Sequence, residues 1–423
     1  MKKRTVITII TLSLFLMSGI VAIDYYRSIY VSYQEENKSV HEELGNASDV
    51  FVQDDNVLEE PKNSCASFCF FGDNLIHENV LNYANLRAGG NGERSDYGKG
   101  FDFKHLYKEV LPYVEKADFS VCNQSSLVGA NDAPESLSGY PLFNSPSALG
   151  KDLVSIGFDA VNIGNNHLLD MGYDGLQNSL EFWKTQKITQ IGGYLSEDEK
   201  LNAKNKLIEI NNIRCAFLSF TANTNGLYDE NGDCIPYFTL RGTEIMKIML
   251  ESEVKKCDEI SDIVIVMINW ANTAGFEVTE IQKTTANILC NAGADVIIGS
   301  GPKTIQAVEW LVGENGTRTL CAYSLGNFMG TMQYTENLLG GALTFNVAKN
   351  GEETVLKDVL FHPTVIHYNE NFTDIAVFPL EKYSPEQFML HGSNIKYGNK
   401  EYPVLLDIFK RNIPVTFLTD NFK

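Results

Sequence analysis

The sequence lacks paired cysteine motifs and has no surplus of positive charge. Its eight cysteines form no CxxC pair, and most lie inside apolar runs such as residues 64–71, which is typical of small core residues and not of a zinc ligand set. A structural disulfide framework is the less favoured alternative. The formal net charge is −20. A surface this acidic repels phosphate backbones, so we expect no nucleic acid partner. An anionic polymer would need a local basic spot or a bound cation.

Long apolar runs are also scarce, and the prominent one lies at the N-terminus. The basic residues Lys2, Lys3 and Arg4 precede an uncharged run over residues 5–23, close to the ~20 residues that cross a bilayer. The run contains neither a lipobox cysteine nor a clean A-x-A cleavage site. We therefore predict an uncleaved signal-anchor helix over residues 1–23, a single pass through the cell membrane, and an extracytoplasmic body. A cleaved signal peptide remains the alternative.

The next segment and the end of the chain differ in composition from the part between them. Residues 24–62 carry ten acidic and three basic side chains with little apolar periodicity, which predicts an acidic stalk over 24–63. We expect the main domain over 64–331 and a β-rich closing segment and tail over 332–423. An Asn-Gly pair at Asn350 and Gly351 predicts a hairpin between residues 341–347 and 355–361.

Apolar runs of strand length alternate with stretches of helical spacing through the main domain. Residues 142–156, 174–185 and 277–292 have helical spacing. This alternation predicts an α/β fold built in layers. The expected strands, after the first at 64–71, are 119–122, 160–163, 190–191, 215–220, 263–268, 296–298 and 320–323.

Polar clusters follow directly on several of the expected strands. Layered α/β proteins place ligand sites at such strand ends. Each cluster alone could consist of ordinary turn-forming residues, but their recurrence favours a shared site. The clusters are residues 72–77, 123–126, 164–170, 269–270 and 299–303.

Seven motifs in order make the sequence similar to a known family over residues 64–365. It resembles the bacterial capsule-synthesis proteins of the CapA type, which are linked to poly-γ-glutamate capsules. The resemblance implies a layered α/β sandwich like the calcineurin-like metallophosphatase fold, a role at the bacterial cell surface, and membrane-embedded capsule-synthesis components as partners. The motifs are residues 71–77, 117–124, 137–146, 157–172, 220–226, 293–299 and 323–328.

The site that the family implies is incomplete in this sequence. Where the family has Asn-x-Glu, His-Trp-Gly and Gly-x-His-Pro-His, this chain has Ser125, Asn269 and the pair Gly301 and Lys303, so one carboxylate and three imidazoles are missing. Two metal ions ~3.5–4 Å apart need several anionic and nitrogen ligands. We therefore expect no cofactor, although a single Mn, Zn or Fe ion on Asp73, Asn166 and His167 stays open. The candidate site residues are Asp73, Asn74, Asn123, Ser125, Asn166, His167, Asn269 and Lys303.

Three functions remain open at this point. The first is a membrane-anchored CapA-like protein that binds or assembles an anionic capsule polymer during its synthesis, export or retention, without acting as an enzyme. The second is a metal-dependent hydrolase of phosphoester or polymer bonds that uses Asp73, Asn166 and His167. The third is a structural surface protein in which the site only holds the fold together.

Several candidate residues also have an ordinary structural interpretation. Asp73 and His167 could form a hydrogen-bonded pair that stabilises a loop crossing. Asp170 could serve a turn or helix start, and Trp270 could be a core aromatic. Lys303 either binds an anion directly or lies solvated in a surface loop. The histidines His77 and His105 are expected at the surface or in helix packing.

Overall fold

The computed structural model describes residues 63–202, 206–227, 244–270, 275–314, 316–397 and 401–422. The predicted anchor over 1–23 and almost all of the predicted stalk lie outside these residues. The chain from Pro61 onward forms one compact unit. None of the helices in the described residues is long and apolar enough to cross a membrane.

One sheet of the described residues has eight strands and is parallel in one half and antiparallel in the other. Strands β1, β2, β5 and β6 run parallel, and β14, β15 and β16 continue the sheet in antiparallel fashion beside β1. The strands are β1 (Ser64–Asn74), β2 (Phe119–Gln124), β5 (Ala160–Asn162), β6 (Thr189–Ile191), β13 (Asn327–Met329), β14 (Leu339–Asn350), β15 (Glu353–Tyr368) and β16 (Ile375–Pro379).

A second sheet has six strands in the order β11-β12-β10-β9-β8-β7, and its four central strands are parallel. A two-stranded sheet pairs β3 (Leu127–Val128) with β4 (Asn144–Ser145). The strands of the six-stranded sheet are β7 (Leu207–Ile210), β8 (Ile213–Thr221), β9 (Ile263–Asn269), β10 (Val296–Ser300), β11 (Val308–Val312) and β12 (Arg318–Ala322).

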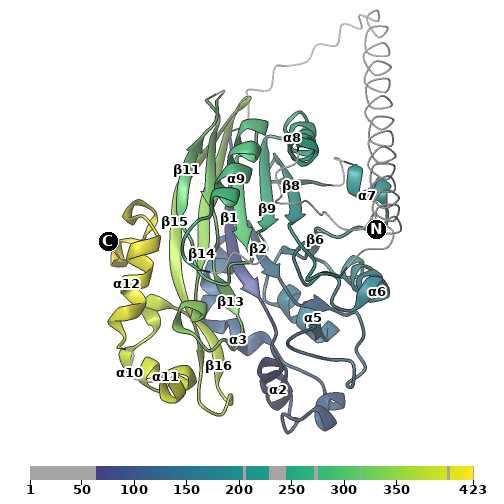
Figure 1. Ribbon diagram of the computed structural model, residues 1–423, viewed down its shortest axis with the longest axis vertical. Coiled ribbons are helices and arrows are strands. Elements are labelled where there is room, and N and C mark those ends of the chain that lie inside the picture. The colour runs from purple at the N-terminus through teal and green to yellow at the C-terminus, as the bar shows by residue number, and fades with distance from the viewer. Residues whose placement is uncertain are drawn as a thin grey trace, which may run out of the picture. The chain divides into compact units, whose positions relative to one another are not determined.

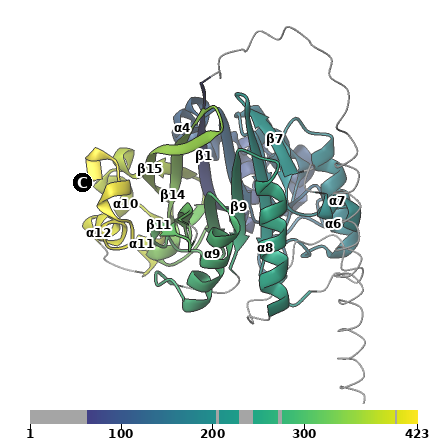
Figure 2. The same ribbon diagram turned by 90° about the horizontal axis from the view of Figure 1, so that it is seen from above.

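The two sheets pack face to face, and helices cover their outer faces (Figure 2). Strand β9 shows the reason: Ile263, Ile265 and Met267 join the core shared with the eight-stranded sheet, whereas Val264 and Val266 point to a second core under two helices. Side chains alternate between the faces of a strand, so a continuously apolar strand is buried on both sides. The layered α/β class predicted from the sequence is confirmed.

The helices that cover the sheets come from segments between the strands. Helices α8 and α9 lie over the six-stranded sheet, and α4 lies on the opposite side of the molecule (Figure 2). The helices are α2 (Glu78–Arg87), α3 (Lys104–Tyr107), α4 (Leu111–Lys116), α5 (Ser147–Ser155), α6 (Gly172–Lys184), α7 (Glu197–Leu201), α8 (Glu244–Asp258), α9 (Glu280–Ala292), α10 (Pro385–Met389), α11 (Gly392–Tyr397) and α12 (Pro403–Asn412).

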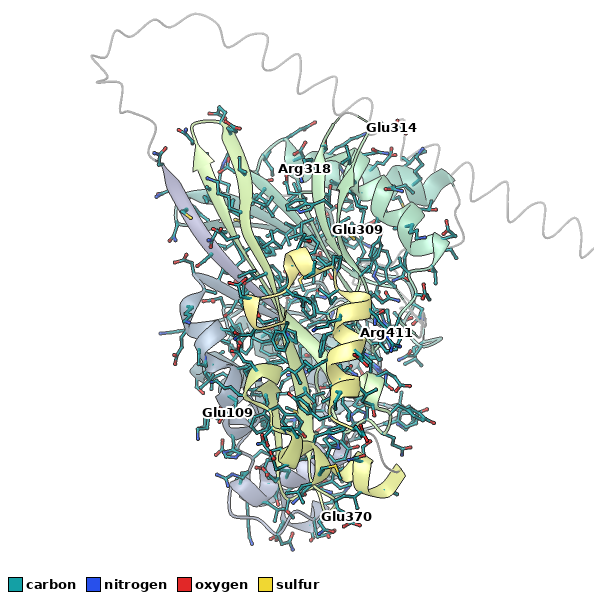
Figure 3. All side chains as sticks on the ribbon, turned by 90° about the vertical axis from the view of Figure 1, so that its left-hand side faces the viewer. Glu109, Glu309, Glu314, Arg318, Glu370 and Arg411 are labelled. Atoms are coloured by element: carbon teal, nitrogen blue, oxygen red, sulfur yellow. The ribbon has the colours of Figure 1, made fainter. Side chains whose placement is uncertain are left out.

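The C-terminal part of the chain completes the eight-stranded sheet. The hairpin predicted around Asn350 is present as β14 and β15, and β14 pairs with β1. Helices α10, α11 and α12 then lie beside β15 (Figure 1), where Phe409 packs against Phe361. Charged side chains of both signs are spread over this face, as the labelled glutamates and arginines in Figure 3 illustrate.

The cysteines of the described residues are free thiols, and all of them except Cys65 are buried. Burial raises the pKa of the Cys257 thiol to about 11 and that of Cys215 to about 12, so these side chains stay protonated. They pack as small apolar residues in the cores, as the sequence suggested.

Candidate functional site

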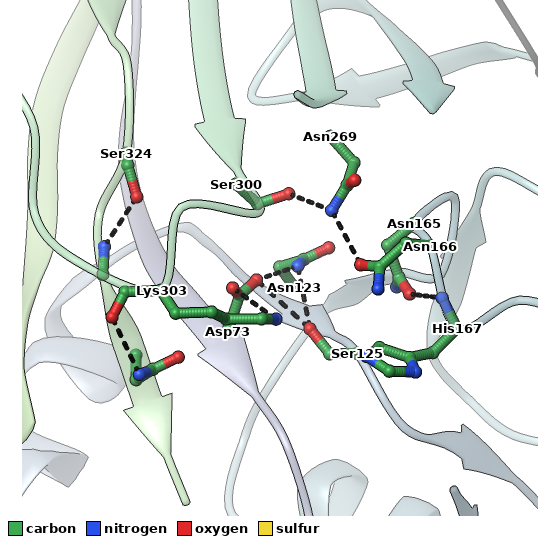
Figure 4. A network of polar contacts seen from close by, with 12 residues as sticks. Asp73, Asn123, Ser125, Asn165, Asn166, His167, Asn269, Ser300, Lys303 and Ser324 are labelled. Atoms are coloured by element: carbon green, nitrogen blue, oxygen red, sulfur yellow. Dashed lines mark hydrogen bonds and ion pairs between the residues drawn. The ribbon is translucent and has the colours of Figure 1, made fainter. Parts of the chain in front are cut away.

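The polar clusters meet at one edge of the two packed sheets. Asp73 and Asn123 lie at the carboxyl ends of β1 and β2, while Asn269 and Ser300 end β9 and β10 of the other sheet. Figure 4 shows these side chains gathered around a common centre. The arrangement follows from parallel pairing, because parallel strands bring their carboxyl ends to the same edge.

Asp73 is the buried carboxylate at the centre, with 1% of its surface exposed. Its Oδ2 accepts a hydrogen bond from Lys303 Nζ at 2.8 Å. Its Oδ1 accepts from Ser125 Oγ at 3.1 Å and from the amide of Asn123. Both oxygens are therefore engaged by donors, and one of these donors is a cation.

Lys303 comes from the loop that follows β10, and 18% of its side chain is exposed. Its backbone has a φ of 60°, in the left-handed region that residues with a Cβ rarely adopt. The interpretation of Lys303 as a solvated surface lysine is wrong, because its ammonium is directed onto Asp73.

A chain of amides connects the Asp73 carboxylate to the second sheet. Asn123 Oδ1 accepts from Asn162 Nδ2 at 2.8 Å, and Asn162 Oδ1 accepts from Ser219 Oγ at 2.7 Å. Ser219 belongs to β8, so the network crosses between the sheets. Buried polar groups that satisfy one another in this way hold a site in a single geometry.

Asn74 belongs to a different network, although it follows Asp73 directly. Its amide donates to Gln124 Oε1 at 2.7 Å, and its Oδ1 accepts from Tyr107 OH at 2.9 Å. Burial raises the pKa of the Tyr107 hydroxyl well above its usual value, while the hydrogen bond to Asn74 acts in the opposite direction. Asn74 therefore supports the end of β1, and its side chain bonds to Gln124 and Tyr107 instead of Asp73 or Lys303.

His167 is held by Asp170. Its Nδ1 lies 2.8 Å from Asp170 Oδ2, which also accepts from the backbone N–H of Phe143 at 2.7 Å. Asp170 lies in a turn, as expected, but its carboxylate joins this turn to the distant segment at Phe143 and orients the imidazole of His167. The alternative in which Asp73 and His167 form a hydrogen-bonded pair is wrong, because Asp73 bonds to Lys303, Ser125 and Asn123, whereas His167 bonds to Asp170.

Asn166 and Asn269 link this turn to the second sheet. Asn269 Nδ2 donates to Asn166 Oδ1 and to Ser300 Oγ, at 3.3 Å in each case. Asn166 Nδ2 donates in turn to Asn225 Oδ1 at 3.0 Å. Trp270 is a buried core aromatic, as expected, and its indole N–H donates to the carbonyl of Tyr323 at 2.8 Å.

His77 also lies at this edge. Its ring packs edge-on against Phe143, with 5.4 Å between the ring centroids. Phe143 in turn packs against the His167 ring, with 4.8 Å between their centroids. Burial lowers the pKa of His77 to about 4, and the nearby charges of Lys303 and His167 act in the same direction. His77 is therefore neutral at physiological pH.

The donor set at this edge does not fit a divalent metal ion. Within the described residues no group of three or more His, Cys, Asp or Glu side chains could hold one. The oxygens of Asp73 are taken by Lys303, Asn123 and Ser125, and a metal beside Lys303 would meet a like charge. Asn166 Oδ1 is likewise occupied by an amide donor.

The family model described as "Bacterial capsule synthesis protein PGA_cap" matches residues 67–332. The chain belongs to this family. The match contains every candidate site residue from Asp73 to Lys303, and it ends before β14. The family named from the sequence motifs is thereby confirmed.

Two curated relatives carry related names. The chain is 29% identical over 202 residues to the "PGA biosynthesis protein CapA" of Bacillus subtilis (strain 168), covering 48% of this chain and 50% of that one. It is 24% identical over 271 residues to the "Capsule biosynthesis protein CapA" of Bacillus anthracis, covering 62% and 61%. The chain thus spans about half to three fifths of the length of these relatives.

A solved structure offers a weaker likeness. The putative 5′-nucleotidase of Staphylococcus aureus, in complex with alpha-ketoglutarate, aligns with 74% of this chain and 54% of that one, at 11% identity and a TM-score of 0.40. The relation to the calcineurin-like metallophosphatase fold therefore stays a prediction.

The sequence predicts that the polar clusters meet at one edge of the fold, but it does not reveal several of the residues that contact them. The sequence predicts a surface or helix-packing position for His77, and it does not mark Asn162, Ser219 or Asn225 as site residues. A signal was present for Asn162, which lies within the expected strand 160–163, two positions before the cluster at 164–170, and ends the observed β5. Ser219 gave no such signal, because it lies inside an apolar strand.

Proposed function

We propose that this protein is a membrane-anchored, extracytoplasmic member of the capsule-synthesis family that binds or assembles an anionic capsule polymer. The polymer is poly-γ-glutamate by family resemblance, and the protein acts during its synthesis, export or retention. The predicted anchor over residues 1–23 holds it at the membrane beside membrane-embedded capsule-synthesis components. The family membership and the two CapA relatives support the pathway.

The observation that carries the proposal is the ion pair between Lys303 and Asp73. The positions at which the family has metal-ligand types hold Ser125, Asn269, Gly301 and Lys303 in this chain. The ammonium thus provides the positive charge of the site, and the metal site is eroded. Without the metal ligands, the protein acts by binding and not by hydrolysis.

A fixed ammonium suits a carboxylate-rich ligand on a protein of this charge. The net charge of −20 repels an anionic polymer at long range, so binding requires a local cation. Lys303 can donate three hydrogen bonds, and one of them goes to Asp73. The two remaining N–H groups can bind a ligand carboxylate through charge-assisted hydrogen bonds.

Metal content separates this proposal from a surviving hydrolase. The full chain is purified gently in detergent, and its zinc, manganese and iron are measured by mass spectrometry. We expect well below one ion per chain. Near-stoichiometric metal that is lost in the Asp73→Asn and His167→Ala variants would overturn the eroded site and favour the hydrolase.

A further inference from the structure

The backbone at Lys303 is held in place by two asparagine side chains. The carbonyl oxygen of Lys303 accepts hydrogen bonds from Asn337 Nδ2 at 2.8 Å and from Asn327 Nδ2 at 3.1 Å. Asn327 Nδ2 also donates to the carbonyl of Asn337, at 2.8 Å. We call Asn327, Asn337 and the Lys303 carbonyl the carbonyl clamp.

The carbonyl clamp has two features that cost stability. Lys303 keeps its left-handed φ of 60° although its Cβ disfavours that region. Asn327 Oδ1 is buried and has no hydrogen-bond partner within the described residues. The amide cannot be flipped to satisfy this oxygen, because both partners of Nδ2 are carbonyl oxygens.

The segment that supplies Asn337 lies outside the region matched by the family model. Asn327 begins β13 within the match, whereas Asn337 belongs to the 3₁₀ turn Thr335–Leu338 that follows residue 332. Side chains from both elements thus converge on Lys303, whose ammonium contacts Asp73.

We propose that Asn327 and Asn337 are positioning residues, which hold Lys303 in its left-handed conformation so that its ammonium stays on Asp73 and meets the anionic ligand. The ligand in this inference rests on the proposed function, whereas the role of the two asparagines in holding Lys303 does not. The two amide donors hold the Lys303 carbonyl, and they thereby fix the backbone from which the long, flexible lysine side chain extends. A fixed ammonium loses less conformational freedom when the ligand binds.

The test measures the reactivity of Lys303 and ligand binding on the same full-length proteins. Lysines are acetylated competitively and quantified by mass spectrometry, and poly-γ-glutamate binding is measured by calorimetry. For Asn337→Ala we expect Lys303 labelling to rise and affinity to fall, each roughly 2- to 12-fold, the range for one net hydrogen bond. Asn337→Asp should have a larger effect, because it places an acceptor oxygen against the Lys303 carbonyl. Asn337→Ser, which keeps a shorter donor, should have a smaller one.

Asn346→Ala is the matched control, because Asn346 also donates one amide hydrogen bond, to the exposed Asp358 at 2.9 Å. It should leave both readouts unchanged. Lys303 labelling that is equal in the wild type and all three Asn337 variants overturns the clamp. Labelling that changes as expected while the wild type binds no polymer upholds the clamp and overturns the proposed function. If Asn337→Asp does not fold, the Ala and Ser variants carry the same comparison.

Discussion

Lys303 Nζ lies 2.8 Å from Asp73 Oδ2, although the two residues are 230 positions apart in the chain. The contact joins the end of β1 in one sheet to the loop after β10 in the other. Asp73 is almost fully buried, and Lys303 retains a small exposed fraction. The pair therefore links the two sheets and leaves a positive charge accessible at their common edge.

Removing the ammonium should destabilise the protein. Lys303→Met leaves the Asp73 carboxylate buried without its counter-charge, which we expect to lower the free energy of unfolding by about 2–3 kcal/mol. Asp73→Asn in the same chain should recover part of that loss, because no charge then remains buried. Urea unfolding of the two single variants and the double variant measures the coupling.

The control for this cycle is Lys283→Met, which breaks an exposed pair with Glu280 at 3.0 Å. It should leave the free energy of unfolding unchanged within experimental error, because solvent screens an exposed ion pair. Strictly additive losses in the Lys303 and Asp73 variants would show that the two residues do not stabilise each other.

Restoring the ligand types should create metal affinity. Ser125→Glu places a carboxylate beside Asp73, and Lys303→His replaces the repelling charge with a neutral nitrogen donor. We expect this double variant to bind Mn²⁺ or Zn²⁺ more tightly than the wild type in calorimetric titration. Equal metal affinities of the double variant and the wild type would contradict this prediction.

The complete restoration also includes Asn269→His and Gly301→His. The Gly301 change should lower stability, because that residue has a φ of 106°, where a side chain is strained. The unmodified protein should show negligible phosphodiesterase activity with added manganese or zinc. Turnover of a model diester at ~1–10³ per second would contradict the eroded site.

The protein should lose stability between pH 6.5 and pH 4, in part through His391. Burial and the neighbouring His367 lower the pKa of His391 to about 4, and its two ring nitrogens contact the Ile366 carbonyl and the Ser393 N–H at 3.1 and 3.0 Å. The unfolded chain therefore binds the proton more tightly. The stabilising contribution is full above pH 6.5 and is lost as the pH falls towards 4.

We expect His391 to account for about 2 kcal/mol of the change between pH 7.5 and pH 5. Urea unfolding at both pH values should give a smaller difference for His391→Gln than for the wild type. Identical pH dependence in the two proteins would exclude His391 as a source. Asp295 contributes to the pH dependence with the opposite sign, because burial raises its pKa to about 7. Its contribution is the same in the wild type and in His391→Gln, so it does not affect the comparison.

The orientation of the body is tested on cells. The basic flank at Lys2–Arg4 and the apolar run over 5–23 predict that the residues from Ser64 onward face outward and stay attached to the membrane. Protease added to intact, wall-stripped cells should degrade or release the body. Protection until the membrane is lysed would reverse the orientation.

The fold and the place of the site could be predicted because they depend on local patterns. Apolar runs at 119–122 and 263–268 became β2 and β9, and polar residues at their ends met at one edge. The partners of Lys303 could not be predicted in this way. Its contact with Asp73 depends on how two sheets pack, and its contacts with Asn337 depend on a left-handed backbone that a lysine does not signal.

His77 and Asp170 show the same limit on a smaller scale. His77 follows Asp73 by four positions, but its neighbours Phe143 and Thr331 come from distant segments. Asp170 was expected at a turn, and the structure adds the His167 ring as a second partner. Contacts between distant loops depend on tertiary packing, which no spacing along the chain reveals.

The most direct test of the account is a calorimetric titration of the full chain with poly-γ-glutamate, performed with and without a metal chelator, for the wild type and for Lys303→Ala. We predict salt-sensitive binding that is unchanged by the chelator and weakened by about 1–3 kcal/mol in the variant, the range for a lost charge-assisted hydrogen bond. Binding that disappears with the chelator, or an affinity equal in the wild type and Lys303→Ala, would contradict it.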